Sequence, residues 1–273
     1  MLTEDQVHFY QTFGYVVVDI DVLSDITTQL HRESEHAIKM AYPDNPVGNL
    51  ILPAMSDETP YSLALIHDKR FLDAVAKLAG PGAIIKPPKI TRFSKPTNWH
   101  RDCYMNLRGV KFAVYFGEPD SEPIPFDVLP ASHDGSVRSY IDLLFSKQAP
   151  SSGGARDPNR HLPKQIPTNT LQLAPGQFLI FDLGLWHANL VPTSRLQWGI
   201  TFLTAPEDNQ SVVDTATHLA EFLEYKREYP KNIFPYLPPS WESGESDSVH
   251  ARVLKDSGVL DQWIALSRAS QGV

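Results

Sequence analysis

Two short sequences in the chain place a histidine two residues before an acidic residue, a spacing with which both side chains can bind one metal ion. They are His31-Arg32-Glu33 and His100-Arg101-Asp102. Residues i and i+2 point to the same side of a strand but to nearly opposite sides of a helix. His31 lies in a predicted helix, so its triplet is interpreted as part of a solvated helix face. His100 and Asp102 follow a predicted strand and a turn, where an extended backbone would direct both side chains to one ion.

A third ligand would complete a facial triad of two histidines and one carboxylate. This arrangement binds non-haem Fe(II) and leaves coordination positions open for a co-substrate and O₂. His187 is the best candidate, because it stands just past the predicted strand 177–183. A lone histidine at the end of a strand is also a common surface or core residue, and that alternative stays open.

Helices dominate the pattern of the first 82 residues, ahead of these candidate ligands. Thr3 and Gln6 have the spacing of a capping box, and Gly14 can end the helix that they begin. The repeat of apolar residues then continues at helical spacing in two further segments. The pattern predicts helices at 3–13, 24–40 and 68–79 and a strand at 15–20.

Short runs of β-branched and aromatic residues, broken by turn residues, follow between residues 83 and 205. Because no helical pattern separates most of these runs, they predict an antiparallel jelly roll and not a parallel α/β sheet. The last run alternates, with Trp198 on a face that should be packed and Gln197 and Gly199 on a polar or small face. The predicted strands are 83–93, 110–116, 124–129, 170–173, 177–183 and 196–203.

Residues 146–169 are rich in Pro, Gly and Ser and are long for a connection. Such a segment is typical of a lid near a site, with a passive loop as the alternative. The chain after it is predicted to return to helix at 215–229 and 257–270. The expected architecture is a mainly β single domain over 1–273, in which a jelly-roll (double-stranded β-helix, cupin-like) core of 83–205 lies between helix-rich parts at 1–82 and 206–273.

The composition excludes several classes of protein. The 24 Lys and Arg against 32 Asp and Glu give a net charge of −8, which disfavours non-specific binding to nucleic acid or to an anionic membrane. A single cysteine, Cys103, cannot form an intrachain disulfide, and the spacing of a structural zinc module is missing from the sequence. The sequence also lacks a secretory leader pattern and an apolar run of transmembrane length. We therefore expect a cytoplasmic protein that acts on a small molecule.

Four motifs occur in order between Leu2 and Phe202. They are Leu2-Thr3-Glu4-Asp5-Gln6 with Phe13-Gly14-Tyr15, Lys95-Pro96 before Trp99-His100-Arg101-Asp102, Val128-Leu129-Pro130-Ala131-Ser132-His133, and Pro175-Gly176-Gln177 before Phe181 and His187. Each motif is short, but their order and spacing are specific. Together they resemble the phytanoyl-CoA dioxygenase family of Fe(II)/2-oxoglutarate-dependent oxygenases.

The resemblance implies an Fe(II) site whose ligands are His100, Asp102 and His187. It also implies an arginine, shortly after the distal histidine, that anchors the far carboxylate of 2-oxoglutarate. Arg195 is the basic residue in that stretch, although the family's arginine usually stands further on, nearer Gln197. Residues 195 and 197 share a strand face, so Arg195 can still reach the pocket. Arg92 is the second candidate, and Asn189 matches a position that often contacts the co-substrate.

The implied reaction consumes O₂ and 2-oxoglutarate, releases succinate and CO₂, and hydroxylates or otherwise oxidises a C–H bond of a small molecule in specialised metabolism, with ascorbate as a stimulant. Related halogenases replace the acidic ligand with a small residue, so the presence of Asp102 favours hydroxylation over halogenation. The acidic chain also argues against a highly charged acyl-CoA substrate.

Other interpretations remain at this point. The chain could be a non-catalytic jelly-roll binding or regulatory protein that retains the metal, or a cupin-like metal-dependent isomerase or hydrolase. Four aromatic residues near the candidate ligands are either substrate wall or core: Trp99, Tyr104, Trp186 and Trp198.

Overall fold

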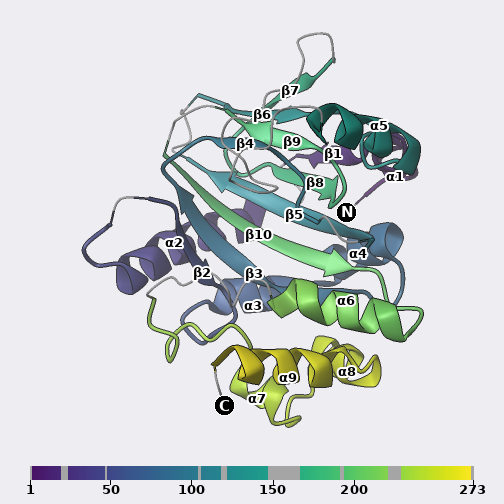
Figure 1. The fold of residues 1–273 in the computed structure, drawn as a ribbon. Helices are drawn as coiled ribbons and strands as arrows, with labels where there is room; N and C mark the ends of the chain where they lie inside the picture. The colour runs from purple at the N-terminus through teal and green to yellow at the C-terminus, as the bar shows by residue number, and fades with distance from the viewer. Residues whose placement is uncertain are drawn as a thin grey trace.

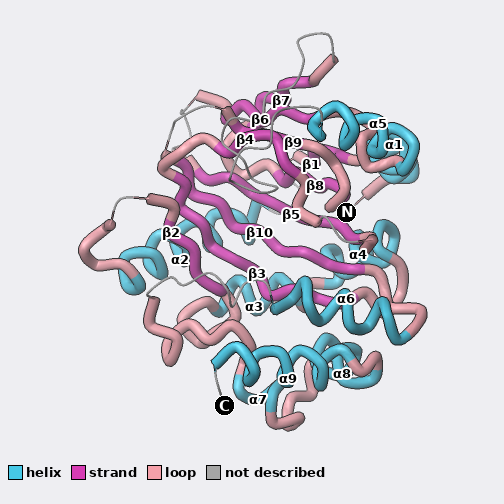
Figure 2. Tube along the Cα trace, viewed as in Figure 1, coloured by secondary structure: helices cyan, strands magenta, loops and turns pink. Residues whose placement is uncertain are grey.

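Two antiparallel sheets face each other, and helices cover their outer sides (Figures 1 and 2). The computed structural model describes residues 2–19, 24–46, 48–103, 106–117, 122–146, 167–190, 194–220 and 229–271. This arrangement confirms the predicted mainly β, jelly-roll fold with flanking helices. Within the described residues, we find no helix long and apolar enough to cross a membrane.

The larger sheet has six strands and the smaller has four. The larger one contains, in order across the sheet, β1 (Tyr15–Val18), β8 (Phe178–Asp182), β5 (Gly109–Phe116), β10 (Arg195–Leu203), β3 (Ile84–Phe93) and β2 (Leu50–Pro53). The smaller one contains β4 (Thr97–His100), β9 (His187–Asn189), β6 (Ile124–Val128) and β7 (Asn169–Leu173). Neighbouring strands in the order are far apart in sequence, so the sheets bring distant segments of the chain together.

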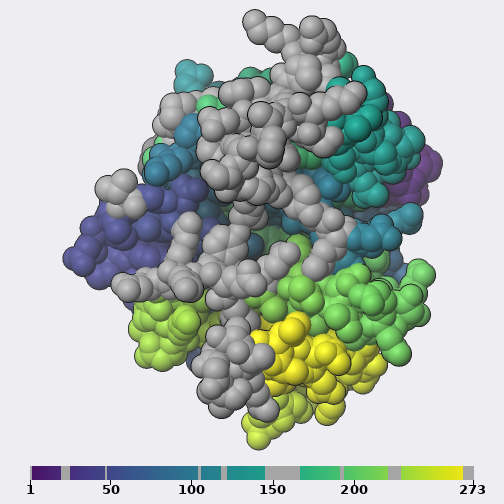
Figure 3. All heavy atoms as spheres, in the orientation of Figure 1, coloured from purple at the N-terminus to yellow at the C-terminus, as the bar shows by residue number. Residues whose placement is uncertain are grey.

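Helices from both ends of the chain pack around the sheets. The first four are α1 (Glu4–Phe13), α2 (Ser24–Ala41), α3 (Pro60–Ile66) and α4 (Lys69–Ala79), of which α2 and α4 contact β10. Helix α5 (Gly135–Ser146) packs on the smaller sheet, where its Ile141 joins an apolar cluster with Trp99 and Trp186. The C-terminal helices are α6 (Asn209–Ala220), α7 (Pro239–Glu242), α8 (Val249–Asp256) and α9 (Val259–Gln271). Figure 3 shows α8 and α9, in yellow-green and yellow, at one end of the visible face.

The N-terminal capping prediction is confirmed in atomic detail. The Thr3 hydroxyl accepts from the Gln6 backbone N–H at 3.2 Å, and the Gln6 side chain accepts from the Thr3 backbone N–H at 3.0 Å. The helix ends at Gly14, whose φ of 82° lies in the left-handed region that favours glycine. A side chain at Gly14 would also meet the ring of His133.

Several short elements were not predicted. Strands β2, β4 and β9 contain three or four residues each, too few for an alternating pattern to stand out. Helices α3, α5, α7 and α8 are likewise missing from the prediction. Three of them, α3, α7 and α8, have only 7, 4 and 8 residues, which is too short for a clear helical repeat of apolar residues. Helix α6 begins at residue 209, earlier than expected, and residues 147–166 of the predicted lid 146–169 lie outside the described residues.

The two faces of β10 have different surroundings, as its alternation predicts. On the outer face, Trp198 and Phe202 pack around Phe71 of α4, with ring centroids 6.4 and 5.8 Å from it. On the inner face, Gln197 and Gly199 line a pocket between the sheets. The packing of the outer face of β10 against α4 therefore holds the strand in place, and with it the inner side chains that line the pocket.

A buried carboxylate on α2 joins the helical layer to β10. Glu33, 7% exposed, accepts hydrogen bonds from the backbone N–H groups of Tyr61 and Ser62 at the start of α3. The Ser62 hydroxyl donates to the same carboxylate and accepts from Trp198 Nε1 at 2.9 Å. Burial raises the pKa of Glu33, and these donors oppose that change. Glu33 thus caps α3, whose own N-cap residue Thr59 makes no side-chain capping bond.

We expect Glu33→Ala to lower the free energy of unfolding by about 2–4 kcal/mol, because it leaves buried donors without their acceptor. Urea denaturation followed by circular dichroism measures this change. Glu35→Ala on the same helix is the matched control, since it removes a partly exposed ion pair with Arg92 at 2.7 Å and should cost no more than about 1 kcal/mol. Equal losses in the two variants would contradict the capping role.

Candidate metal centre and pocket

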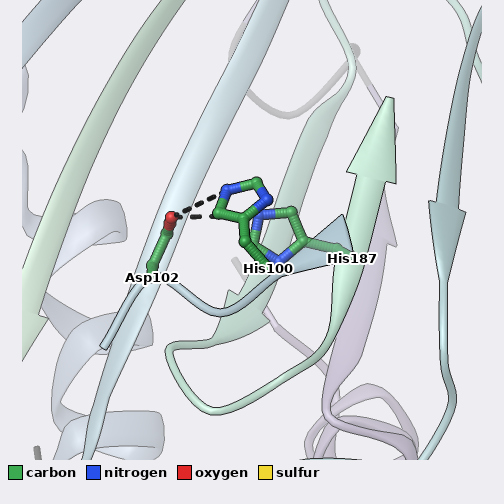
Figure 4. Close-up of side chains that lie close together, drawn as sticks. All are labelled: His100, Asp102 and His187. Carbon is green, nitrogen blue, oxygen red and sulfur yellow. Dashed lines mark ion pairs between the residues drawn. The ribbon is translucent and has the colours of Figure 1, made fainter. Parts of the chain in front are cut away.

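Strand pairing places the three candidate ligands beside one another. His100 ends β4, His187 begins β9, and the two residues are directly opposite in the antiparallel ladder, with ring centroids 4.3 Å apart. Asp102 lies in the turn after β4, which is held by a bond from its backbone N–H to the Leu183 carbonyl at 3.1 Å. Its Oδ1 lies 3.5 Å from His100 Nε2 and 3.8 Å from His187 Nε2 (Figure 4). One ligand atom from each residue lies within 4.8 Å of the others.

Backbone carbonyls set the orientation of both imidazole rings. The Nδ1 of His100 is 2.7 Å from the Asn98 carbonyl oxygen, and that of His187 is 2.9 Å from the Leu185 carbonyl oxygen. A carbonyl oxygen can only accept, so each Nδ1 carries a proton, and in the neutral, metal-binding form of each ring the lone pair is on Nε2. Both lone pairs then face Asp102, which is the donor arrangement that a divalent transition metal requires.

The electrostatics keep Asp102 and His187 in their metal-binding forms. Burial, followed by the neighbouring His100, lowers the pKa of His187 to about 3, so this imidazole is neutral. Burial alone would raise the pKa of Asp102, but the charge of the nearby Lys111 ammonium is the main opposing cause, and the pKa lies well below its usual range. The Lys111 ammonium lies 2.7 Å from Asp102 Oδ2. The site therefore presents an ionised Asp102 beside a neutral His187, the forms in which both residues bind a metal.

The triad opens into a pocket of about 340 Å³ between the two sheets. Phe126 stacks on the His187 ring at 5.3 Å, and Phe181 packs against it at 4.7 Å, so apolar side chains shield one side of the centre. The inner faces of β3, β5 and β10 form the opposite wall, where the lining includes Lys89, Lys111 and Arg195. The pocket thus combines a metal-ligand set with several cationic side chains.

Arg195 lies in this wall, as the sequence suggested. It is 4% exposed, its guanidinium carbon lies 4.4 Å from the centre of the Phe93 ring, and its Nη2 donates to the Thr97 hydroxyl at 3.1 Å. Burial lowers the pKa of Arg195, yet an arginine stays charged in proteins. Burial also raises the pKa of the neighbouring Tyr115, whose hydroxyl is hydrogen-bonded to Gln197 and stays protonated.

Asn189 and Gln197 also line the pocket. The Asn189 side-chain amide donates to the Pro125 carbonyl at 2.8 Å, and its buried Oδ1 accepts no hydrogen bond from the described residues. An acceptor of this kind fits a hydroxyl or N–H group of a ligand better than a carboxylate.

Other candidates lie away from the pocket. The structure does not bring Arg92 into it, because this residue faces α2 and forms an ion pair with Glu35 at 2.7 Å. Trp99 and Trp186 belong to the apolar cluster under α5, and Trp198 to the core against α3 and α4. Of the two readings of these tryptophans, the structure supports core and not substrate wall, while Tyr104 lies outside the described residues.

Sequence reasoning missed part of the pocket wall. Lys89 on β3 and Lys111 and Tyr115 on β5 all face the cavity. The period-2 rule could have found them, because Lys111 and Tyr115 share a strand face and Lys89 shares one with Phe93. The His31 triplet lies on helix α2, as predicted, and outside the pocket lining. Its interpretation as a solvated face is wrong, because Glu33 is 7% exposed and caps α3, and the His31 ring stacks on Phe116 at 5.0 Å.

No family model matches the sequence, and no curated protein matches it. Solved structures do share its fold at low sequence identity. AviO1 from Streptomyces viridochromogenes Tue57 has a TM-score of 0.54 and 13% identity, over 76% of this chain and 98% of its own. HygX from Streptomyces hygroscopicus, solved with nickel and 2-oxoglutarate bound, has a TM-score of 0.51 and 16% identity, over 75% and 88%. SnoK, a non-heme alpha-ketoglutarate-dependent carbocyclase from nogalamycin biosynthesis, has a TM-score of 0.52 and 15% identity, over 75% and 85%.

These similarities show that the chain shares its jelly-roll fold with AviO1, HygX and SnoK. They do not single out the phytanoyl-CoA dioxygenase family, which stays a prediction from the sequence motifs. The metal-ligand geometry described above comes from the chain itself and is independent of the comparison.

We expect His187→Ala to weaken binding of Fe(II) or Ni(II) by at least about 100-fold, because it removes one of three ligands in a buried site. Isothermal titration calorimetry under anaerobic conditions measures the affinity, and circular dichroism verifies folding. His36→Ala is the matched control, since His36 is exposed on α2 and lies far from the pocket lining. Undiminished metal affinity in His187→Ala would show that the triad is not the binding site.

Proposed function

We propose that the protein is an Fe(II)- and 2-oxoglutarate-dependent oxygenase that hydroxylates a C–H bond of a small molecule. The observation that carries this proposal is the convergence of two Nε2 lone pairs and one ionised carboxylate on the wall of a pocket that also holds a buried arginine. A metal bound by three residues on one side keeps positions open for other ligands. The wider family resemblance and the shared fold agree with it.

The chain's own side chains would divide the work as follows. His100, Asp102 and His187 would hold the iron, which when bound supplies the activation of O₂ that couples decarboxylation of 2-oxoglutarate to substrate oxidation. The planar guanidinium of Arg195 would bind the far carboxylate of 2-oxoglutarate through paired hydrogen bonds. The two phenylalanines beside His187 would keep bulk water from that side of the centre. Overall, substrate, O₂ and 2-oxoglutarate give hydroxylated substrate, succinate and CO₂.

The reaction outcome is proposed from the acidic ligand. Asp102 is present where a halogenase would carry a small residue, so the chain has no position freed for a halide by that exchange. SnoK is a carbocyclase, which shows that this fold also supports oxidative outcomes other than hydroxylation. Product analysis therefore has to accompany any assay of turnover.

Anaerobic addition of Fe(II) and 2-oxoglutarate to the protein should produce a visible charge-transfer band, and subsequent exposure to O₂ should release succinate slowly even without substrate. Absorption spectroscopy and quantification of succinate measure the two steps. Protein that binds Fe(II) but gives neither the band nor succinate would overturn the proposal and favour a metal-retaining binding protein.

We expect Arg195→Gln to raise the 2-oxoglutarate concentration needed for half of the charge-transfer signal by about tenfold or more, because it removes a charge-assisted pair of hydrogen bonds. An anaerobic spectrophotometric titration gives this value. Arg92→Gln is the matched control, since Arg92 lies outside the pocket lining and should leave the titration unchanged. An unchanged requirement in Arg195→Gln would exclude Arg195 as the anchor.

A further inference from the structure

The pocket has the opposite charge from the chain as a whole. The chain carries a net charge of −8. Among the described residues that line the pocket, the cationic side chains are Lys89, Lys111 and Arg195, and the only acidic one is Asp102. A cleft lined by one sign of charge between low-dielectric walls concentrates ligands of the other sign.

The proposed cofactors do not cancel this positive charge. A ferrous ion and a 2-oxoglutarate dianion have equal and opposite charges, so together they add nothing to the sum of the pocket. Arg195 would pair with one carboxylate of the co-substrate, and Asp102 faces Lys111. An excess of two positive charges therefore stays with the described lining when both cofactors are bound.

Lys89 and Lys111 lie on the two strands that flank β10, near Gly199, which has no side chain. Gly199 is paired with Lys89 of β3 in one ladder and with Ala113 of β5 in the other, and the side chain of Lys111, two residues along β5, lies against it. A Cβ at Gly199 would lie 3.5 Å from Lys111 Cε and 3.7 Å from Gln197 Oε1, which is ordinary contact, so alanine would fit there. A glycine in the interior of a strand marks a bulge or close approach of a ligand or another backbone, and the β10–β3 ladder does shift register between Gly199 and Thr201. Here it leaves the pocket floor open between two ammonium groups.

This end of the wall is separate from the Arg195 end. Arg195 pairs with Phe93, four residues along β10 from the row of Gly199 and Lys89, a separation of roughly 13 Å along an extended strand. Lys111 also reaches the metal-ligand set, since its ammonium contacts Asp102 and lies 5.4 Å from the Phe181 ring centre. A ligand group bound between the lysines would thus lie beside the triad and away from Arg195.

We propose that Lys89 and Lys111, across Gly199, form an anion-binding subsite for the substrate, which carries a carboxylate or phosphate group. The proposal rests on the oxygenase function above and specifies its substrate class. Two ammonium groups at the floor would bind the anionic group and fix which C–H bond of the same molecule faces the metal centre. The acidity of the whole chain, which argued against a highly charged substrate, does not describe the pocket.

Binding of small aromatic probes to Ni(II)- and 2-oxoglutarate-loaded full-length protein tests the subsite. Benzoate and phenyl phosphate supply the two anionic groups, and benzamide is the neutral counterpart of benzoate. Saturation-transfer NMR titrations should give at least about tenfold tighter binding for one or both anions than for benzamide, because only the anions can pair with the lysines. The tighter of the two anions identifies a carboxylate or a phosphate as the preferred group. Equal binding of all three probes would overturn the proposal.

Variants then locate the subsite. Lys89→Gln should weaken the preferred anion about tenfold and leave benzamide unchanged, while Lys69→Gln, at an exposed position on α4, should alter neither. Lys89 is chosen over Lys111 because the Lys111 ammonium forms an ion pair with the proposed metal ligand Asp102 at 2.7 Å. Gly199→Ala, which adds one methyl group to the floor, should also weaken the anion. Anion binding that is unchanged in both pocket variants would overturn the proposal.

Two further readouts separate this inference from the function on which it rests. If Lys89→Gln weakens 2-oxoglutarate in the charge-transfer titration and leaves the anionic probes unchanged, the lysine binds the co-substrate and the subsite is refuted. If the wild-type protein gives no charge-transfer band, the oxygenase proposal fails, whereas the probes can still be titrated against the metal-free protein to judge the subsite alone.

Discussion

The negative charge of one largely buried carboxylate must be balanced by its surroundings, and this requirement governs the architecture of the site. Asp102 has a side chain that is 16% exposed and carries a full negative charge, which is costly away from water unless cations or donors surround it. Lys111 on β5 supplies a cation at 2.7 Å, whereas the histidines of β4 and β9 turn metal-binding Nε2 atoms toward the carboxylate and, in that form, donate no hydrogen bond to it. The six-stranded sheet thus contributes the counter-charge and the four-stranded sheet the ligands. A divalent metal would add the remaining positive charge, so the site is electrostatically most complete when it is loaded.

Both faces of β10 contribute to placing the cationic pocket wall opposite Asp102. The strand lies between β3 and β5, the two strands that carry the lysines of the pocket wall. Its outer side chains interlock with α4, and Trp198 is further held through Ser62 and Glu33. Since packed cores transmit small displacements, a shift of β10 would move the inner wall relative to the triad. Residues that never touch a ligand therefore determine how precisely the pocket wall is placed.

Much of this arrangement could be predicted from the sequence, because strand periodicity is a local property. The jelly-roll strands, the capping box at Thr3 and the shared face of residues 195 and 197 all follow from spacing. The pairing of β4 with β9 could not, since each strand is so short that pairing across the sheet, and not local propensity, stabilises it. The positions of the tryptophans were equally unpredictable from local sequence. Nearness in sequence to His100 and His187 does not say on which face of a sheet an indole lies.

The charge of the pocket is the property that was hardest to predict from the sequence. A net charge of −8 describes the field far from the protein, where acidic surface residues dominate. Inside a pocket of low dielectric constant, screening by solvent is weak and a few close groups decide the potential. Lys89, Lys111 and Arg195 come from three different strands, and only the order of those strands in the sheet brings them together. The same topology that assembles the metal ligands thus assembles the positive wall opposite them, and both are properties of the fold that composition does not contain.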